Sequence, residues 1–341
     1  MKTFASDNWS GVHPDVMAAL ASANKEHAPA YGNGGITAAA IERIRQHFGK
    51  KTDVCFVFGG TGANVTALAS ITRPYNSIIC ADVAHINVHE AGATEHFAGC
   101  KLISLPTKDG KITVEQIEEK LGVLGDAHSA QPSVVSLTQA TDYGTVYTLD
   151  EIRKITSFAH SNGLLVHMDG ARISNAAVSL GKTLKEITVD AGVDVLSLGM
   201  TKNGAMMAEA VLFFNPELGQ DFKHVRMNGM QLASKMRFMA VQFDAMLTND
   251  LWKRNATNAN NMAKLLAEKA SKVQGVSITQ KVEANEVFAI MPKHAIALVQ
   301  KQFPFYVWNE KTSEVRWIAS FDTIEKDVLD FVTAIKNNLV V

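Results

Sequence analysis

The first segment that could do chemistry is a glycine cluster at residues 59–62. Gly59-Gly60-Thr61-Gly62 follows the apolar run Val54–Phe58 and leads into a helical stretch. Free N–H groups at a helix start, together with the Thr61 hydroxyl, can bind a phosphate group. The G-x-G-x-x-G and G-K-[ST] patterns are both absent, which disfavours a dinucleotide or a nucleoside triphosphate. The alternative interpretation is a tight connection with no ligand.

Two further strand ends carry an acidic residue and a lysine. Asp169 follows the apolar run Leu164–Met168, at the position where open α/β sheets bind ligands, although it could equally cap a helix. Lys202 follows Val195–Leu198 in an uncharged turn that ends at Gly204. A lysine in such a turn is usually a surface residue, but a desolvated one can form an imine.

The three segments together match the anchors of one cofactor. Pyridoxal 5′-phosphate (PLP) is held by its phosphate, by a carboxylate at its pyridine nitrogen and by a lysine at its aldehyde. The phosphate would lie at Gly60 and Thr61, the pyridine nitrogen against Asp169 and the aldehyde on Lys202. The sequence therefore predicts a PLP site.

The elements that position these residues form an α/β pattern over residues 50–215. Short apolar runs alternate there with helical stretches, as in a mostly parallel sheet whose strands are buried on both faces. Seven runs are predicted strands: Val54–Phe58, Ser77–Cys80, Leu102–Leu105, Val134–Leu137, Leu164–Met168, Val195–Leu198 and Ala210–Phe214. Leu149–Asn162 is a predicted helix because its apolar residues recur every three or four positions.

The character of the chain changes after residue 215. Residues 222–272 predict long helices, one of which crosses from the first domain to a second. Three strands and a closing helix follow, at Val276–Ile278, Val287–Met291, Val315–Ser320 and Glu325–Leu339. We expect a large α/β domain over residues 1–248 and a small α+β domain over residues 249–341.

At nearly every motif the chain resembles the threonine aldolase family, which belongs to the aspartate-aminotransferase-like, fold type I PLP enzymes. The matching segments are Ser6-Asp7-Asn8, Ala30-Tyr31-Gly32, Gly60–Asn64, Ala84-His85-Ile86, Glu90-Ala91-Gly92, Asp169–Arg172, Thr201–Gly204 and Val315-Arg316-Trp317. Leu137–Thr141 departs from the Glu-Asn-Thr-His segment of many members. Together with Thr201-Lys202-Asn203-Gly204 it is similar to the branch of low-specificity L-threonine and phenylserine aldolases.

The resemblance implies roles for individual residues. Lys202 would be the Schiff-base lysine and Asp169 the partner of the pyridine nitrogen. Further residues would contact the phosphate, the ring, the cofactor or the substrate carboxylate: Gly60 and Thr61 the phosphate, His85 the ring, Arg172 the cofactor, and Ser6 and Arg316 the carboxylate.

Histidine is suited to be the catalytic base because its pKa is near ~6.5. His85 and His128 are the two candidates; His128 corresponds by resemblance to a histidine near the substrate, but could be a solvated loop residue. His89 could contact the substrate side chain, and Arg226 a ligand's carboxylate or phosphate, although both could be plain helix surface residues. We expect no metal, because His85 and His89 lack a third ligand at a recognisable spacing.

The predicted reaction is retro-aldol cleavage of L-threonine, L-allo-threonine or a related β-hydroxy-α-amino acid, possibly phenylserine, to glycine and an aldehyde. An arginine that holds the carboxylate, such as Arg316 with Ser6, can set which bond at Cα is broken. The same anchors also serve β-elimination and transamination, which remain alternatives. A binding protein without turnover is disfavoured by the intact Lys202, Asp169, His85 and Arg316.

Composition limits the possible partners. The chain has 33 Lys+Arg against 34 Asp+Glu, a net charge of −1, so we expect neither nucleic-acid nor membrane-surface binding. No apolar run is long enough for a membrane span, and no signal peptide is apparent. Three cysteines in apolar surroundings predict a reduced, cytoplasmic protein. The resemblance implies a homodimer or homotetramer.

Overall fold

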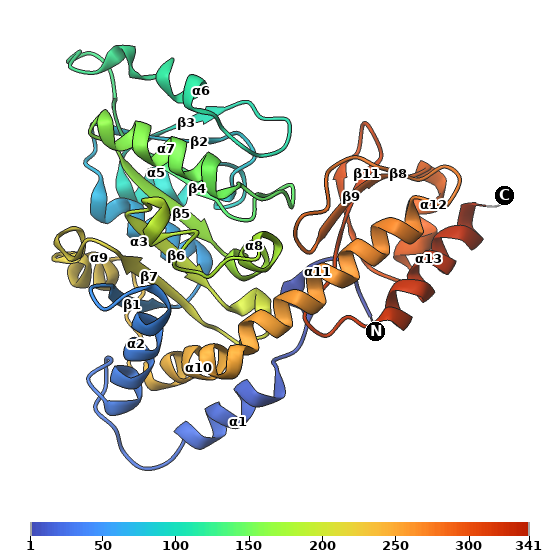
Figure 1. The fold of residues 1–341 in the computed structure, drawn as a ribbon, viewed down its shortest axis with the longest axis horizontal. Coiled ribbons are helices and arrows are strands. Elements are labelled where there is room, and N and C mark those ends of the chain that lie inside the picture. The colour runs from blue at the N-terminus through green and yellow to red at the C-terminus, as the bar shows by residue number, and fades with distance from the viewer. Residues whose placement is uncertain (1, 340–341) are drawn as a thin grey trace.

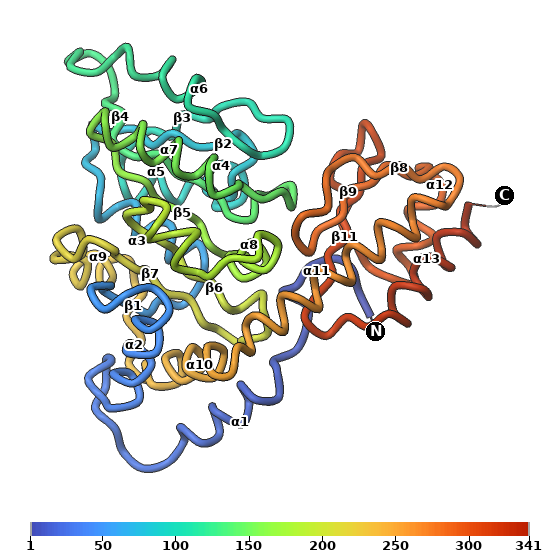
Figure 2. Tube along the Cα trace, viewed as in Figure 1, coloured from blue at the N-terminus to red at the C-terminus, as the bar shows by residue number. Residues whose placement is uncertain are grey.

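The large domain is built on a seven-stranded sheet. The computed structural model describes residues 2–339, and Figures 1 and 2 show the sheet flanked by helices. The strand order is β1-β7-β6-β5-β4-β2-β3. The strands are β1 (Asp53–Val57), β2 (Asn76–Ala81), β3 (Lys101–Leu105), β4 (Gln131–Thr138), β5 (Leu165–Gly170), β6 (Val195–Gly199) and β7 (Glu209–Phe213).

The sheet is mostly parallel, as predicted, and only β7 runs against its neighbours. β7 pairs antiparallel with β1 and with β6, so that Glu209 stands in one row with Val57 and Gly199. Each of the seven predicted runs is a strand. β4 begins at Gln131, earlier than predicted, because Gln131-Pro132-Ser133 lacks the β-branched apolar residues that mark a strand.

Helices cover the sheet and fix where its loops emerge. They are α1 (Pro14–Ala23), α2 (Gly35–Phe48), α3 (Gly60–Ile71), α4 (His85–Val88), α5 (Ala93–Ala98), α6 (Val114–Glu118), α7 (Leu149–Ser161), α8 (Ile173–Leu180), α9 (Phe222–Asn228) and α10 (Arg237–Leu247). α7 matches its predicted span within a residue and starts at a capping box in which Thr148 and Glu151 bond each other's backbone N–H groups.

The small domain is an antiparallel sheet of order β10-β11-β9-β8 with two helices. Its elements are β8 (Ser277–Ile278), β9 (Glu286–Ile290), α12 (Lys293–Gln300), β10 (Tyr306–Asn309), β11 (Glu314–Ile318) and α13 (Glu325–Leu339). The predicted strands and closing helix are present. β10 and α12 were not predicted, and β10 lies at a sheet edge, where a four-residue strand leaves little pattern in the sequence.

One long helix connects the part of the chain that carries the seven-stranded sheet with the part that carries the four-stranded sheet. α11 (Leu251–Ala270) runs from the large domain to the small one (Figure 2) and packs on both α8 and α13. The expected boundary at residue 248 coincides with the 3-10 turn Thr248–Asp250. The first residues lie with the small domain instead, because the Phe4 ring stacks on Phe331 at 4.4 Å.

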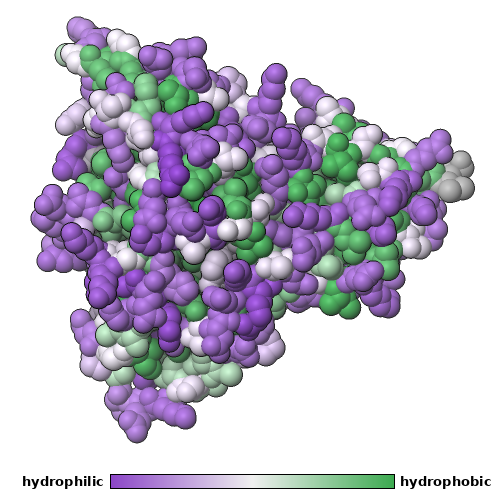
Figure 3. Space-filling model, in the orientation of Figure 1, coloured by the Kyte–Doolittle hydropathy of each residue, from purple (hydrophilic) through white to green (hydrophobic). Residues whose placement is uncertain are grey.

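One face of the molecule shows how its surface is composed. The face shown in Figure 3 is largely hydrophilic, with separate apolar areas over both domains. Between residues 2 and 339, no helix has the length and apolar character that crossing a bilayer requires.

Candidate active site

A pocket of about 390 Å³ lies where the loops after the parallel strands meet the small domain. The chain returns to this edge after β2, β4, β5 and β6, and the hairpin β10–β11 closes it from the small domain. Six of the residues predicted from sequence line this one pocket: Ser6, His85, His89, Arg172, Lys202 and Arg316. The carboxyl edge of the sheet is where α/β folds bind ligands.

Asp169 lies at the end of β5 and is tied to the start of α3. Its Oδ1 accepts a hydrogen bond from the Ala171 N–H at 2.9 Å, and its Oδ2 accepts one from Asn64 Nδ2 at 2.8 Å. Asn64 is the fifth residue of α3, the helix that begins with Gly60 and Thr61. The predicted carboxylate and the predicted phosphate turn therefore belong to one hydrogen-bonded unit.

The start of α3 is open to a ligand. Gly59 precedes the helix and no side chain caps its first N–H groups. A Cβ atom built on Gly59 or Gly60 would meet nothing within 4 Å, so the backbone can be approached closely. Uncapped N–H groups at a helix start favour an anion such as phosphate.

His85 is held by a buried carboxylate. Its Nδ1 donates to Glu90 Oε1 at 2.8 Å, and the Glu90 side chain is fully buried. The hydrogen bond to Glu90 raises the pKa of His85, burial opposes this, and the charge of Asp169 adds to the increase. The neighbouring His89, whose ring centroid lies 5.7 Å from that of His85, has a pKa lowered by burial and by His85.

Arg172 forms a buried, two-pronged ion pair with Asp7. Nε lies 2.8 Å from Asp7 Oδ2, Nη2 lies 3.0 Å from Asp7 Oδ1, and Glu286 Oε1 is 3.5 Å from Nη2. Burial alone would raise the pKa of Asp7, but Arg172 and Lys202 hold it below its usual value. Asn285 Nδ2 also donates to Asp7, at 3.1 Å.

Arg316 projects from the small domain and is framed by aromatic rings. Its guanidinium lies 5.8 Å from the Tyr306 ring centroid and 5.3 Å from that of Trp308. Its Nη1 is 3.8 Å from Glu286 Oε1, and its Nε has no hydrogen-bond partner within residues 2–339. A guanidinium beside two aromatic rings, with an unused donor, is suited to binding a carboxylate.

Two further buried acids surround Lys202. Burial raises the pKa of Asp142, which lines the pocket, to about 7, and Asp169 and Glu286 add to this increase. Burial also raises the pKa of Glu209 to about 7, against the opposing effects of Thr201 and Lys202.

Sequence reasoning assigned no role to several residues of the site. Asn64 and Glu90 lay within the motifs that carried the resemblance, which was a usable signal. The others had none: Asp142, Glu209, Glu286, Tyr306 and Trp308. The three acids matter because the fold brings them close to other charged groups, and Tyr306 and Trp308 lie on the unpredicted strand β10.

Five predicted residues do not line this pocket: Gly60, Thr61 and Asp169 belong to the α3–β5 unit described above, and His128 and Arg226 lie on other segments. His128 is exposed in the loop before β4, at the amino end of that strand, and only its backbone is held, by Asp126. Arg226 on α9 points its Nη1 at the Phe56 carbonyl oxygen, at 3.4 Å. Within the described residues, His128 and the pocket therefore lie at opposite edges of the sheet.

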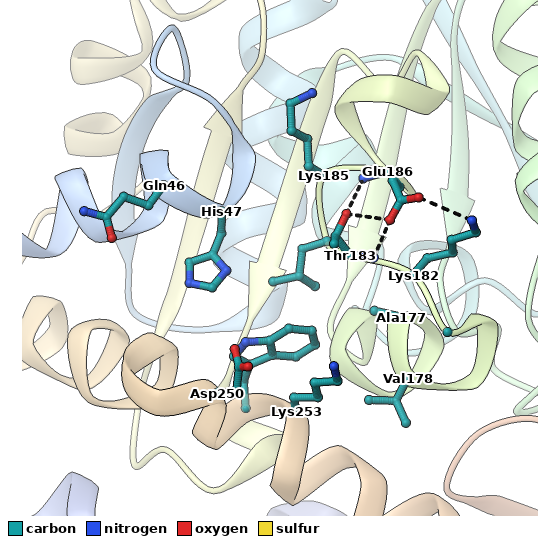
Figure 4. Close-up of a pocket in the computed structure, with 13 residues that line it drawn as sticks. Gln46, His47, Ala177, Val178, Lys182, Thr183, Lys185, Glu186, Asp250 and Lys253 are labelled. Carbon is teal, nitrogen blue, oxygen red and sulfur yellow. Dashed lines mark hydrogen bonds and ion pairs between the residues drawn. The ribbon is translucent and has the colours of Figure 1, made fainter.

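A different hollow, of about 510 Å³, is lined by α2, α8 and the start of α11. Figure 4 shows Glu186 bonded to Lys182 and Thr183 there, with His47 on the opposite wall. It contains none of the residues predicted from sequence to form the site.

Fold and site together define the class of protein. Residues 3–294 match the family model described as β-eliminating lyase, and the chain belongs to this family. Within it, the chain is 45% identical over 322 residues to a low specificity L-threonine aldolase of Pseudomonas aeruginosa, covering 94% of this chain and 93% of that one. It is 42% identical over 335 residues to the enzyme of the same name from a Pseudomonas species, covering 98% and 96%.

A solved structure supports the same assignment. The threonine aldolase of Leishmania major superposes with a TM-score of 0.93 at 28% identity, and each chain is covered completely. The predicted fold type I architecture is thereby confirmed.

Proposed function

We propose that this chain is a PLP-dependent aldehyde-lyase that cleaves L-threonine, L-allo-threonine or a related β-hydroxy-α-amino acid to glycine and an aldehyde. The observation that carries the proposal is the convergence of Lys202, Arg316, Arg172, His85 and Ser6 on one pocket, next to Asp169. The names of the similar proteins support the same reaction.

The residues present fit PLP. The uncapped start of α3 at Gly60 and Thr61 would hold the phosphate, Asp169 the pyridine nitrogen and Lys202 the aldehyde carbon. Bound there, the cofactor would supply an electron sink for a bond broken at the substrate Cα. The buried Asp169, which already accepts two hydrogen bonds, is oriented before any ligand arrives.

The chain's own residues would select the bond. Arg316 and Ser6 would bind the substrate carboxylate, and the flanking Tyr306 and Trp308 rings limit how the guanidinium can turn. A carboxylate fixed at both oxygens sets the rotation of the groups on Cα. In retro-aldol cleavage, the aligned bond is the one to the hydroxyl-bearing carbon.

A base must also remove the hydroxyl proton. The Glu90 hydrogen bond raises the pKa of His85, which favours its charged form, whereas burial and His85 lower the pKa of His89, which favours its neutral form. His89 is therefore the base candidate within the chain's own pocket, and His128 is the candidate supplied by a second copy. We propose a homodimer or homotetramer on the latter ground.

The test is a cofactor and product assay. Purified protein should absorb near ~420 nm with PLP bound, and Lys202→Ala should abolish both that absorbance and turnover. Lys182→Ala, which changes an exposed lysine 41% accessible at its side chain, is the matched control and should change neither. Glycine and aldehyde should be released from L-threonine, L-allo-threonine or L-phenylserine. Release of pyruvate and ammonia, or of a keto acid, would instead establish elimination or transamination.

The three cysteines support a cytoplasmic location as part of the same proposal. Cys55, Cys80 and Cys100 are all free thiols, and burial raises the pKa of each. Buried thiols of this kind are inert packing residues.

A further inference from the structure

A continuous row of hydrogen bonds connects His85 to Asp169. His85 Nδ1 lies 2.8 Å from Glu90 Oε1, Asn64 Nδ2 lies 2.9 Å from the same oxygen, and Asn64 Nδ2 lies 2.8 Å from Asp169 Oδ2. Asn64, Glu90 and Asp169 are each at most 5% exposed. Of the two inner members, the mechanism described so far uses only the hydrogen bond from His85 to Glu90, and it gives Asn64 no role.

The two residues after Glu90 have left-handed backbone conformations. Ala91 has φ 52° and Gly92 has φ 72°, so two consecutive residues are left-handed between α4 and α5. A non-glycine residue in this conformation costs roughly 1–2 kcal/mol. Such strain persists where the surroundings enforce it and often lies next to functional groups. The turn directs the Glu90 side chain inward, where it is fully buried.

Counting donors and acceptors fixes the state of each group. Asn64 Nδ2 has two hydrogens and contacts one carboxylate with each, so the amide can take only this orientation. Glu90 Oε1 accepts from Asn64 and also faces His85 Nδ1, an arrangement that an ionised Glu90 and a protonated Nδ1 satisfy. Glu90 Oε2 has no hydrogen-bond partner in the described part of the chain, so the carboxylate depends on these two donors.

The charges around His85 come from several elements. Glu90, Asp169 and Asp142 are the acids that face it, and Lys202 and His89 are the basic groups. The Glu90 hydrogen bond has the largest effect and raises the pKa of His85. A neutral glutamine would keep the shape of Glu90 but remove this charge.

We propose that Glu90 is a positioning residue that keeps His85 Nδ1 protonated and, through the Asn64 amide, binds the imidazole and Asp169 into one unit. This proposal rests on the proposed function in one respect only, namely that the pyridine ring of PLP is the group that His85 and Asp169 contact. The two groups expected to contact the pyridine ring, His85 at its face and Asp169 at its nitrogen, are thus oriented by one buried carboxylate.

The direct test is an NMR titration of the histidine Cε1–H signals in the protein as purified, without substrate. The His85 signal is assigned by its loss in His85→Gln. Glu90→Gln should lower the pKa of His85 by about one unit, a tenfold change in its protonation equilibrium, and leave His128 unchanged. Glu119→Gln, at a side chain 73% exposed, is the matched control. An unchanged His85 titration in Glu90→Gln would overturn the proposal.

A second variant separates positioning from mere support of the fold. Asn64→Ala breaks the connection to Asp169 but keeps the Glu90 charge. It should weaken PLP binding in an absorbance titration and leave the raised pKa of His85 in place. Combined with Glu90→Gln, its effect on PLP affinity should be non-additive; strict additivity would contradict the single unit.

The test remains decisive if Glu90→Gln does not fold. Glu90→Asp keeps the charge but withdraws it by one methylene, and it should also lower the pKa of His85; no change would overturn the proposal. Failure of every variant and of the parent to bind PLP would refute the proposed function, while the titration would still decide the role of Glu90.

Discussion

At the scale of single residues, the site depends on which buried groups are charged. Asp142 illustrates this, because its carboxyl lines the pocket and its Oδ2 has no hydrogen-bond partner among residues 2–339. Its pKa rises from 3.8 to about 7 in the folded protein. The folded state therefore holds a proton that the unfolded state releases, and stability is lost as the pH rises through this window.

Asp142→Asn should remove the loss of stability that the parent shows as the pH rises. In cofactor-free protein, the variant's gain in free energy of unfolding should be larger at pH 8 than at pH 5.5, by about 2 kcal/mol, as measured by urea denaturation. Asp221→Asn, at an exposed position, is the control and should show no such pH dependence. A gain of equal size at both pH values would contradict the assigned protonation of Asp142.

The role of a residue could be predicted from the sequence only where the residue lies in a recognisable motif. Lys202, Asp169 and the Gly60 turn each follow an apolar run and could be recognised as strand ends. Asp142 and Glu286 could not, because their importance depends on burial beside charges contributed by distant segments.

At the scale of elements, the strands were predictable and their pairing was not. Each apolar run predicted a strand, but nothing in the run Ala210–Phe214 shows that it returns antiparallel between β1 and β6. β10 gave no signal, because Tyr306–Asn309 is short and lies at an edge. Pairing depends on contacts between segments far apart in the chain, whereas periodicity reports only local structure.

The turn into α3 leaves no room for a side chain at Gly62. A Cβ on Gly62 would lie 2.3 Å from Gln231 Oε1, which accepts a hydrogen bond from the Phe58 N–H at 3.0 Å. Gly62→Ala should displace Gln231, loosen the turn and weaken PLP binding three- to tenfold, or about 1 kcal/mol, in an absorbance titration. Gly122→Ala, whose Cβ would meet open space, should bind PLP normally. Equal affinity in the two variants would show that the turn does not depend on Gln231.

At the scale of the whole molecule, a buried network joins the two domains under the pocket. Asp7, near the start of the chain, accepts from Arg172 of the large domain and from Asn285 of the small one. The sequence predicted two domains and a crossing helix. It did not predict this network or the place of Phe4 in the smaller core, because single contacts across more than a hundred residues leave no periodic pattern.

Asp7→Asn should destabilise the protein, because it leaves the buried Arg172 without its main partner. We expect a loss of about 3 kcal/mol in the free energy of unfolding near pH 7, measured by urea denaturation. Because the pKa of Asp7 is lowered in the folded protein, the parent should be more stable than the variant above pH ~4. This difference in the free energy of unfolding should disappear as the pH falls through that lowered pKa.

The control for this comparison is a surface pair. Glu268→Gln removes the partner of Lys272, whose side chain is 66% exposed, and should leave the free energy of unfolding almost unchanged. Losses of similar size in the two variants would show that the buried network contributes no more than a solvated one.

The residues of the proposed site come from around two separate sheets, and the hairpin β10–β11 supplies those of the smaller one. Lys202, Asp169 and the α3 turn stand on the large domain, whereas Arg316, Tyr306 and Trp308 reach the pocket from a sheet with its own core. Under the proposed function, exchanges of Tyr306 and Trp308 would change the surroundings of Arg316, and with them the substrate range, without replacing Lys202 or Asp169. An exchange of Arg316 itself would also change which bond is aligned for cleavage, so substrate range can diverge independently of the chemistry only at the positions around it.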